Sequence, residues 1–324
     1  MTNPTERLLA NIRELAPGIT SRAAEIEAGR RMPPDLVGSA EIDRRLSYFR
    51  VSEPWRAGAR YAGGAGDLRS AQHADWMFGL CVMTEGGKLV PRSAGKGWPP
   101  LVQGVFLPMR DWQTEDTWYV AWLKGTGSHH ITLRDTVVPA GNFFDLANGV
   151  PCVPGPLYQA VLQLLPLMHG ASSVGIAEGA LDELVELANT GRQQLQAAVP
   201  MRDSETFQAE LGPIAAELRA ARAFLQVQAA SHWRHALAGT LKDEALLTQV
   251  TQTAIWIATT CVRAADACFA LAGSSALYET SPLQRRLRDL HVAAQHSGAQ
   301  QRHYVKADKL LLGSAVASSK IVGD

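Results

Sequence analysis

The chain has 324 residues, enough for two or more packed units, and its 31 basic residues balance its 31 acidic ones. This balance gives neither the basic stripe of a nucleic-acid-binding protein nor the basic helix of a membrane-surface protein, and no stretch reads as a membrane span or a secretory signal. We therefore expect a protein that binds neither nucleic acid nor membrane. The four cysteines show no metal-binding spacing, and a reducing cytoplasm is the expected location.

The first part of the chain is predicted to be helical. Apolar residues repeat at helical spacing over residues 5–30, and Pro33-Pro34 can start a second short helix. Residues 48–54 read as extended, and the glycine-rich residues 56–70 have the composition of a loop. We take residues 1–66 as an N-terminal helical segment.

A small β domain is predicted over residues 67–150. Apolar and aromatic runs of strand length recur between about residue 74 and Pro139. The five expected strands are residues 76–83, 102–107, 117–122, 131–133 and 136–138.

Long helices are predicted in the last part of the chain, residues 151–324. One starts near Pro166, two span residues 203–237 and 243–271, and one follows Pro282. The apolar stripe of the second, which includes Phe207 and Leu218, steps by three and four residues. Four such helices with short connections predict an antiparallel four-helix bundle, so the fold class is mainly α with a small β domain.

The C-terminal segment concentrates arginine and histidine on what we predict to be a single helix. These side chains bind anions or move protons, whereas an ordinary surface helix pairs glutamate with lysine. The residues concerned are Arg285, Arg286, Arg288, Asp289, His291, His296, Arg302 and His303.

Several segments together resemble the acyl-CoA dehydrogenase superfamily, and within it the flavin-dependent monooxygenases that form the oxygenase half of two-component phenol hydroxylases. The weaker matches are residues 31–37 with 48–54, and residues 72–76. The more specific ones are Asp116-Thr-Trp118 with residues 124–129, and residues 271–275 with 281–284, Arg288-Asp289 and Gln295-His296. The family has further helices and strands where this chain has only residues 57–71, so its N-terminal domain is shortened.

The resemblance implies a homotetramer that binds FAD or FMN, reduced by a separate flavin reductase. It places Trp118 and the loop Gly125, Thr126, Gly127 and Ser128 along the flavin, whereas the loop motif alone favours an ordinary hairpin turn. It makes His296 the catalytic acid or base that favours the phenolate form of a substrate. The alternative is a surface histidine. Asp289 lies too far along the predicted helix to orient that ring.

Two arginines are candidate ligands for flavin phosphates. Arg288 could bind such an anion or form salt bridges, and Arg263, within an apolar helix, is expected to hold a buried anion or ion pair. His232 and His235 lack further ligands for a metal site. Glu178 and Glu183 read as solvated bundle residues, so the glutamate base of the dehydrogenase branch cannot be placed.

The expected activity is hydroxylation of an aromatic or polyketide-like small molecule by reduced flavin. An acyl-CoA dehydrogenase-type flavin oxidoreductase is the enzymatic alternative. A non-catalytic paralogue that serves as a scaffold or partner subunit is the other, because the shortened N-terminal domain could leave no closed cleft.

Overall fold

The computed structural model describes residues 4–33, 35, 66–67, 75–93, 96–145, 155–159 and 161–312. The chain forms two compact units, residues 1–154 with 320–324 and residues 155–319, which are taken separately below. The expected division at residue 66 stays a prediction, because most residues around it lie outside the described ranges. The same holds for the expected second helix beyond residue 35 and for the extended segment at 48–54.

The N-terminal helix is broken once. Helix α1 spans Pro4–Ser21 and α2 spans Ala23–Gly29, because Arg22 leaves the helical conformation with φ −103° and ψ 13°. Helix α2 ends at Arg30, whose left-handed backbone, φ 53°, lets its N–H donate to the carbonyl of Glu27. Glycine usually occupies such a cap, so arginine carries a conformational cost here.

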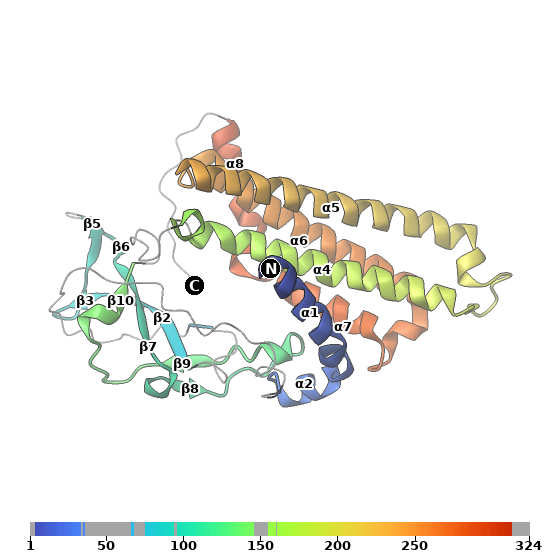
Figure 1. The fold of residues 1–324 in the computed structure, drawn as a ribbon, viewed down its shortest axis with the longest axis horizontal. Helices are drawn as coiled ribbons and strands as arrows, with labels where there is room; N and C mark the ends of the chain where they lie inside the picture. Colours follow the sequence, from blue (N-terminus) through green and yellow to red (C-terminus); the bar gives the residue numbers. More distant parts are fainter. Residues whose placement is uncertain are drawn as a thin grey trace. The chain divides into compact units, whose positions relative to one another are not determined.

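The β unit contains two three-stranded antiparallel sheets and two short hairpins (Figure 1). One sheet has the order β10-β7-β2, the other the order β1-β9-β8, and the hairpins are β3-β4 and β5-β6. The strands are β1 Gly66–Asp67, β2 Trp76–Val82, β3 Thr84–Glu85, β4 Lys88–Leu89, β5 Pro91–Ser93, β6 Lys96–Pro100, β7 Val102–Pro108, β8 Gln113–Glu115, β9 His130–Thr132 and β10 Phe143–Phe144.

Three of the five expected strands are present, and two are wrong. Strands β2, β7 and β9 match the predictions, whereas residues 117–122 and 136–138 form no strand. The aromatic run at 117–122 has strand composition, but its N–H groups bond within the loop: Trp118 donates to Nδ1 of His129 and Tyr119 to the carbonyl of Thr117. Local contacts therefore override intrinsic preference.

The core of the β unit lies on one face of the β2-β7 pair. Met77 pairs with Leu107 and Gly79 with Val105, so alternate residues of each strand point into the same apolar cluster. Trp112 closes this cluster, and its ring packs directly over Gly79. The indole of Trp112 fills the space left by the missing side chain of Gly79.

The second unit is an antiparallel helical bundle (Figure 1). Its helices are α4 Val161–Asn189, α5 Glu205–Ala238, α6 Glu244–Ala272, α7 Pro282–Ala293 and the short α8 Tyr304–Leu311. Ser204 and Asp243 cap α5 and α6 by accepting the backbone N–H three residues on, and Gly273 ends α6 with φ 59°. The predicted boundaries are thus confirmed for α5 and α6, and the predicted start after Ser281 is confirmed for α7, while α4 begins five residues before Pro166.

The bundle core follows the predicted apolar stripes. The buried residues of α5 include Phe207, Leu218 and Ala221, and α6 contributes Cys261 and Cys268, both fully buried. Burial raises the pKa of each thiol to about 12, so both act as inert core residues. Contrary to expectation, residues 244–277 are apolar and long enough to cross a membrane by length and composition, but half of that apolar window is buried in the bundle.

The C-terminal segment is not a single helix. Helix α7 ends at Ala293, and two single turns of 3-10 helix, Ser297–Ala299 and Gln301–His303, lead to α8. Residues 294–296 leave the helix, and Ser297 and Gly298, which disfavour continued helix, follow in the first 3-10 turn. Asp289 and His296 therefore do not share a helix face, and the expected continuous Arg/His surface is divided among three elements.

Candidate functional site

The glycine loop of the β unit is a fixed turn. Lys124–Thr126 form a 3-10 turn between two left-handed residues, Leu123 with φ 51° and Gly127 with φ 54°. The hydroxyl of Thr126 donates to the carbonyl of Leu123 at 2.9 Å and lies 3.2 Å from the hydroxyl of Ser128. The turn is therefore held by its own side chains.

Trp118 lies in the same loop. Its indole Nε1–H donates to the carbonyl of Leu123 at 3.2 Å, and its backbone N–H donates to Nδ1 of His129 at 3.4 Å. Both ends of the loop are thus connected across the turn, and the indole is half-buried with its orientation set. The structure brings together all five β-domain residues predicted to contact a cofactor.

A charged network surrounds the base of the loop. Both terminal nitrogens of Arg30 donate to the carboxylate of Asp116, at 2.8 and 3.0 Å, and the hydroxyl of Tyr119 donates to the same group at 2.7 Å. The Arg30 hydrogen bonds hold the pKa of Asp116 down at about 2, so this carboxyl stays ionised at neutral pH. Nδ1 of the buried His129 lies 3.3 Å from Asp116.

His296 is fixed at the other candidate centre, within the bundle. It is the N-cap of the 3-10 turn Ser297–Ala299, and its Nδ1 accepts the backbone N–H of Gly298 at 3.2 Å. Its ring stacks on the ring of His169 from α4, with centroids 5.2 Å apart and planes 28° from parallel. Because Nδ1 accepts a hydrogen bond, the neutral ring carries its proton on Nε2.

Known proteins resemble this chain in sequence and in fold. The family model of the acyl-CoA dehydrogenase C-terminal domain matches residues 167–301. Indole-3-acetate monooxygenase of Pseudomonas putida is 29% identical over 226 residues, which cover 69% of this chain and 57% of that protein. The flavin-dependent monooxygenase oxygenase subunit HsaA of Mycobacterium tuberculosis is 27% identical over 248 residues, which cover 72% and 59%.

Two solved structures have the same fold. The 3-HSA hydroxylase from Rhodococcus sp. RHA1 superposes with a TM-score of 0.79 at 18% identity, covering 96% of this chain and 98% of that one. XiaF from Streptomyces sp., solved with FADH2 and glycerol, superposes with a TM-score of 0.70 at 21% identity, covering 93% and 76%. The chain is therefore similar in sequence to flavin-dependent monooxygenases, and its residues 167–301 match the acyl-CoA dehydrogenase C-terminal domain. The chain spans roughly 60% of the length of the curated relatives it matches, with 57% of the Pseudomonas putida protein and 59% of HsaA covered.

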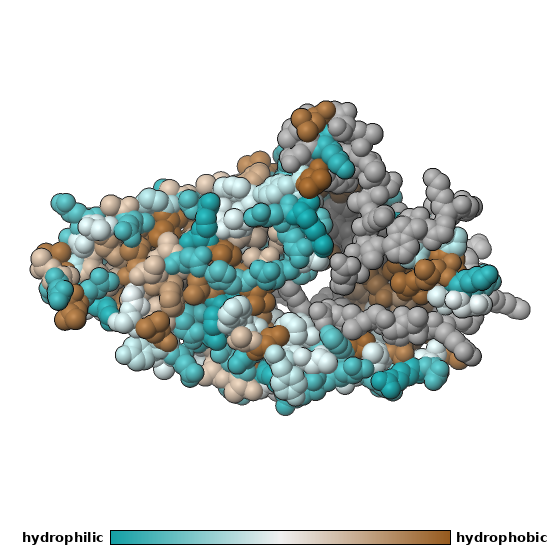
Figure 2. All heavy atoms as spheres, turned by 180° about the vertical axis from the view of Figure 1, so that it is seen from behind, coloured by the Kyte–Doolittle hydropathy of each residue, from teal (hydrophilic) through white to brown (hydrophobic). Residues whose placement is uncertain are grey.

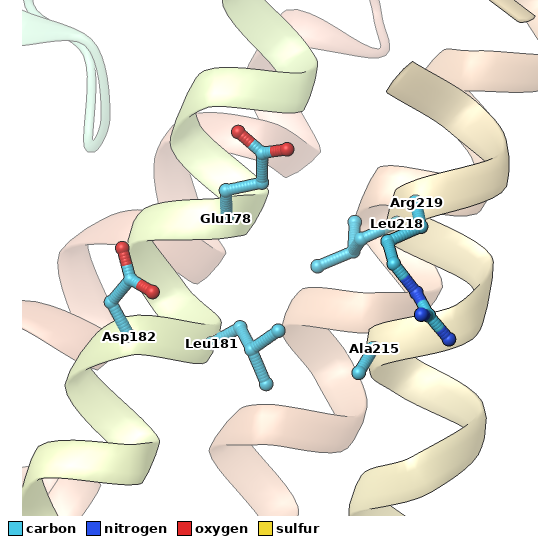
Figure 3. A pocket seen from close by; sticks show the side chains of 6 residues that line it. All are labelled: Glu178, Leu181, Asp182, Ala215, Leu218 and Arg219. Carbon is cyan, nitrogen blue, oxygen red and sulfur yellow. The ribbon is translucent and has the colours of Figure 1, made fainter. Parts of the chain in front are cut away.

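The superfamily's dehydrogenase branch needs a glutamate base, and both candidate glutamates are paired. Glu178 binds Arg222 of α5, with Nε 2.5 Å from Oε1. Figure 3 shows Glu178 on α4 beside the groove where Leu181 and Leu218 point toward one another. Burial raises the pKa of Glu183, and the Arg286 hydrogen bonds, at 2.9 and 3.1 Å, oppose that rise.

Of the two arginines predicted to bind flavin phosphate, neither is buried. The Arg263 side chain is 59% exposed and pairs with Glu217 of α5 at 3.5 Å, so an ion pair is present but the expected burial is wrong. Arg263 lies off the buried stripe of α6, whose neighbours Ala264 and Ala265 are 2% exposed. Nε of Arg288 donates to the carbonyl of Gln284 in its own helix at 3.3 Å. Arg263 thus faces α5, while His296 faces α4.

His232 and His235, the two histidines considered as metal ligands, differ in their surroundings. His232 is buried in α5, while His235 is half-buried with its Nδ1 2.9 Å from the hydroxyl of Thr240. Among the described residues, no three histidine, cysteine or carboxylate side chains gather as metal ligands. Both histidines are explained by their place in the bundle.

The β-unit loop fits a flavin in its chemistry. A flavin needs an apolar contact surface and hydrogen-bonding groups for its ring edge, and the loop has the oriented indole of Trp118 with the hydroxyls of Thr126 and Ser128. Thr126 uses its proton on Leu123 and one lone pair on Ser128, so its hydroxyl keeps one acceptor lone pair, and that of Ser128, which donates to Thr126, keeps two.

Sequence reasoning missed Arg30 and Tyr119, which contact Asp116 in the β unit, and His169, which stacks on His296 in the bundle. The contacts of Arg30 and His169 join residues far apart in the chain, so no local pattern identifies them.

Proposed function

We propose that this chain is the oxygenase component of a two-component flavin-dependent monooxygenase, which hydroxylates an aromatic or polyketide-like small molecule. The relatives at 27–29% identity are monooxygenases by name, which supports this reaction class. The fixed imidazole of His296 is the single observation that carries the proposal, because a hydroxylase acting on a phenol needs an oriented proton-transfer group.

Reduced FAD or FMN, when bound, supplies the oxygen chemistry. In this proposal Trp118 and residues 125–128 hold the ring system, and the protein orients the substrate and excludes water. XiaF was solved with FADH2, in keeping with a reduced cofactor for this chain. Reduced flavin has to come from a separate reductase, as the "oxygenase subunit" in the name of HsaA also suggests.

The tautomer of His296 defines its part in the reaction. With Nδ1 occupied by the N–H of Gly298, the neutral ring presents Nε2–H, which donates a hydrogen bond to a phenolic oxygen. Such a donor stabilises the phenolate, the form with the greater electron density on the ring. To accept a proton at Nδ1, His296 has to give up its bond to Gly298. We therefore assign the neutral ring the role of hydrogen-bond donor that stabilises the phenolate, with the phenol's proton released to solvent.

The variant His296→Ala tests the proposal. Hydroxylation of a phenolic substrate should fall by about 10²–10⁴-fold while the folded state persists, because general acid–base groups contribute that much. His291→Ala is the matched control, since His291 is occupied with Asp266 at 2.8 Å. Turnover by His296→Ala equal to that of wild type removes His296 from the mechanism.

The two alternatives predict different results in a flavin titration. A scaffold subunit stays colourless with FAD and FMN in either redox state. A dehydrogenase binds oxidised flavin and reduces it with an acyl thioester, yet Glu178 and Glu183 are both held by arginines. A monooxygenase binds the reduced form and consumes oxygen with substrate.

We further propose a cytoplasmic homotetramer. Phe224 of α5 and Trp256 of α6 are partly exposed and pack edge to face with centroids 5.6 Å apart, and Val227 is 65% exposed. Figure 2 shows apolar residues among polar ones on one face of the molecule. Apolar surface on long bundle helices is the kind that oligomers bury. Sedimentation of the purified protein measures this directly, and a monomer contradicts it.

A further inference from the structure

The C-terminal end of α2 packs closely against the loop of Gly125–Ser128. Gly125 faces α2 so closely that a Cβ placed on it would lie 2.4 Å from Cγ2 of Ile26. A Cβ on Gly127 would lie 3.3 Å from the carbonyl oxygen of Arg30. Both glycines of the loop are therefore needed for close approach to the same end of the same helix.

Arg30 makes three kinds of contact with this loop. It forms the two hydrogen bonds to Asp116, it donates to the carbonyl of Trp118 at 3.3 Å, and its guanidinium lies 4.2 Å from the ring centre of Tyr119. A planar guanidinium can bind a carboxylate with two parallel bonds and stack on an aromatic ring at once, whereas an ammonium cannot.

The network joins both ends of the loop to one side chain. Asp116 and Trp118 lie at the start of the loop, and His129, in reach of both, lies at its end. A single exposed ion pair contributes little to stability. Here, however, several hydrogen bonds of the loop converge on Arg30, whose backbone is fixed as the left-handed cap of α2. The sequence separation of 86 residues between Arg30 and Asp116 makes this a tertiary contact.

We propose that Arg30 is a positioning residue for cofactor binding: with Asp116 and Tyr119 it holds the loop of Trp118 and Gly125–Ser128 in its binding conformation. This inference rests on the proposed flavin function for its consequence, though not for the contact itself. It gives the short N-terminal helical segment a specific role in the site. Arg30 does not touch the cofactor in this proposal; it acts through the loop.

The experiment compares Arg30→Ala, Arg30→Lys and the control Arg22→Ala in the full-length protein. Arg22 belongs to the same helical segment and also forms an ion pair, with Glu25, so the control removes equal charge without touching the loop. Two quantities are measured: hydrogen exchange of residues 117–130 in the ligand-free protein, and affinity for reduced and oxidised FAD and FMN.

Arg30→Ala should speed hydrogen exchange in residues 117–130 and weaken flavin binding by about 10-fold, because the loss of charged hydrogen bonds typically changes affinity by that factor. Arg30→Lys should recover only part of either effect, because it cannot bind Asp116 in two places. Added guanidinium ion at low millimolar concentration should restore some affinity to Arg30→Ala and none to Arg30→Lys.

A double-mutant cycle completes the test. Asp116→Ala combined with Arg30→Ala should weaken binding no more than either change alone, while Asp116→Ala and Arg22→Ala should act additively. Unchanged exchange in Arg30→Ala overturns the positioning role. Faster exchange with unchanged flavin affinity also overturns it. A wild-type protein that binds no flavin refutes the proposed function instead, while the exchange data still report on the contact.

Discussion

The helical bundle and the β unit obtain their order from different sources. In the bundle, α5 and α6 bury residues at every third or fourth position, and the side chains of Ser204 and Asp243 cap their first turns. In the β unit the strands are short, and the longest structured loop, from Asp116 to His129, is held by Arg30 from α2. Bundle order is encoded locally in periodicity, while loop order depends on residues far apart in the chain.

Each unit has a glycine that makes room for one neighbouring side chain. Gly104 of β7 faces the ring of Phe144, and a Cβ there would lie 2.2 Å from that ring. In the bundle, a Cβ on Gly179 of α4 would lie 2.6 Å from the guanidinium carbon of Arg286. The β-unit glycine thus admits an aromatic ring, whereas the bundle glycine admits a charged group that pairs with Glu183.

The largest expected effect is on the bundle. Leu218→Asp places a charge at a position 1% exposed within the bundle core, which should cost about 4 kcal/mol or more. Ala220→Asp, two residues on and exposed, is the control and should change stability little. Circular dichroism with chemical denaturation measures both. A stable helical Leu218→Asp variant would mean that the assigned core face of α5 is wrong.

This contrast explains which parts of the fold could be predicted from sequence. The stripe containing Phe207 and Leu218 identified the buried face of α5, because helical spacing depends only on neighbours along the chain. Residues 117–122 look like a strand by composition, yet Tyr119 is 71% exposed and Trp118 bonds within its loop. Nothing local records that Arg30 binds Asp116.

The same reasoning applies to the candidate site. The loop residues 125–128 were identifiable because glycine and hydroxyl residues cluster there, and the fold brings Trp118 to them. The cap role of His296 was not predictable from a helical pattern that was expected to continue past Ala293. The stack with His169 depends on α4 meeting the C-terminal segment, which periodicity does not specify.

Gly104→Ala should break the β unit without affecting the bundle. The added methyl has to displace the buried ring of Phe144, at a cost of about 1–3 kcal/mol. Gly141→Ala, in the same unit but with nothing within 4 Å, is the matched control. Thermal unfolding followed by near-ultraviolet circular dichroism should show a lower Tm for Gly104→Ala alone. Equal Tm values would mean that the Phe144 ring can move aside freely.

Gly127→Val examines the loop rather than either core. Valine at φ 54° is strained by about 1–2 kcal/mol, and its Cβ would meet the carbonyl oxygen of Arg30 at 3.3 Å. We expect flavin affinity to fall by about 10-fold with global stability little changed, since the loop rather than the core is disturbed. Fluorescence titration with FAD and FMN measures the affinity. An affinity equal to that of wild type would mean that the loop is an ordinary turn with no part in flavin binding.

The smallest expected effect is a pH dependence in the bundle. His232 is 3% exposed, and neither ring nitrogen has a hydrogen-bond partner. Burial lowers the pKa of His232, so the folded state holds a neutral ring while the unfolded chain binds a proton below about pH 6.5. The stability that depends on a neutral His232 is therefore complete above that pH and is lost as the pH falls.

His232→Leu should remove this dependence. Relative to wild type, the variant should gain a few degrees in Tm between pH 7 and pH 5, since leucine has no proton to bind. Thr248→Val is the control. The Thr248 hydroxyl is also buried without a hydrogen-bond partner, but it does not titrate, so the change in Tm should be equal at both pH values. A Tm difference between wild type and His232→Leu that stays constant across this range would mean that the ring is already solvated in the folded bundle.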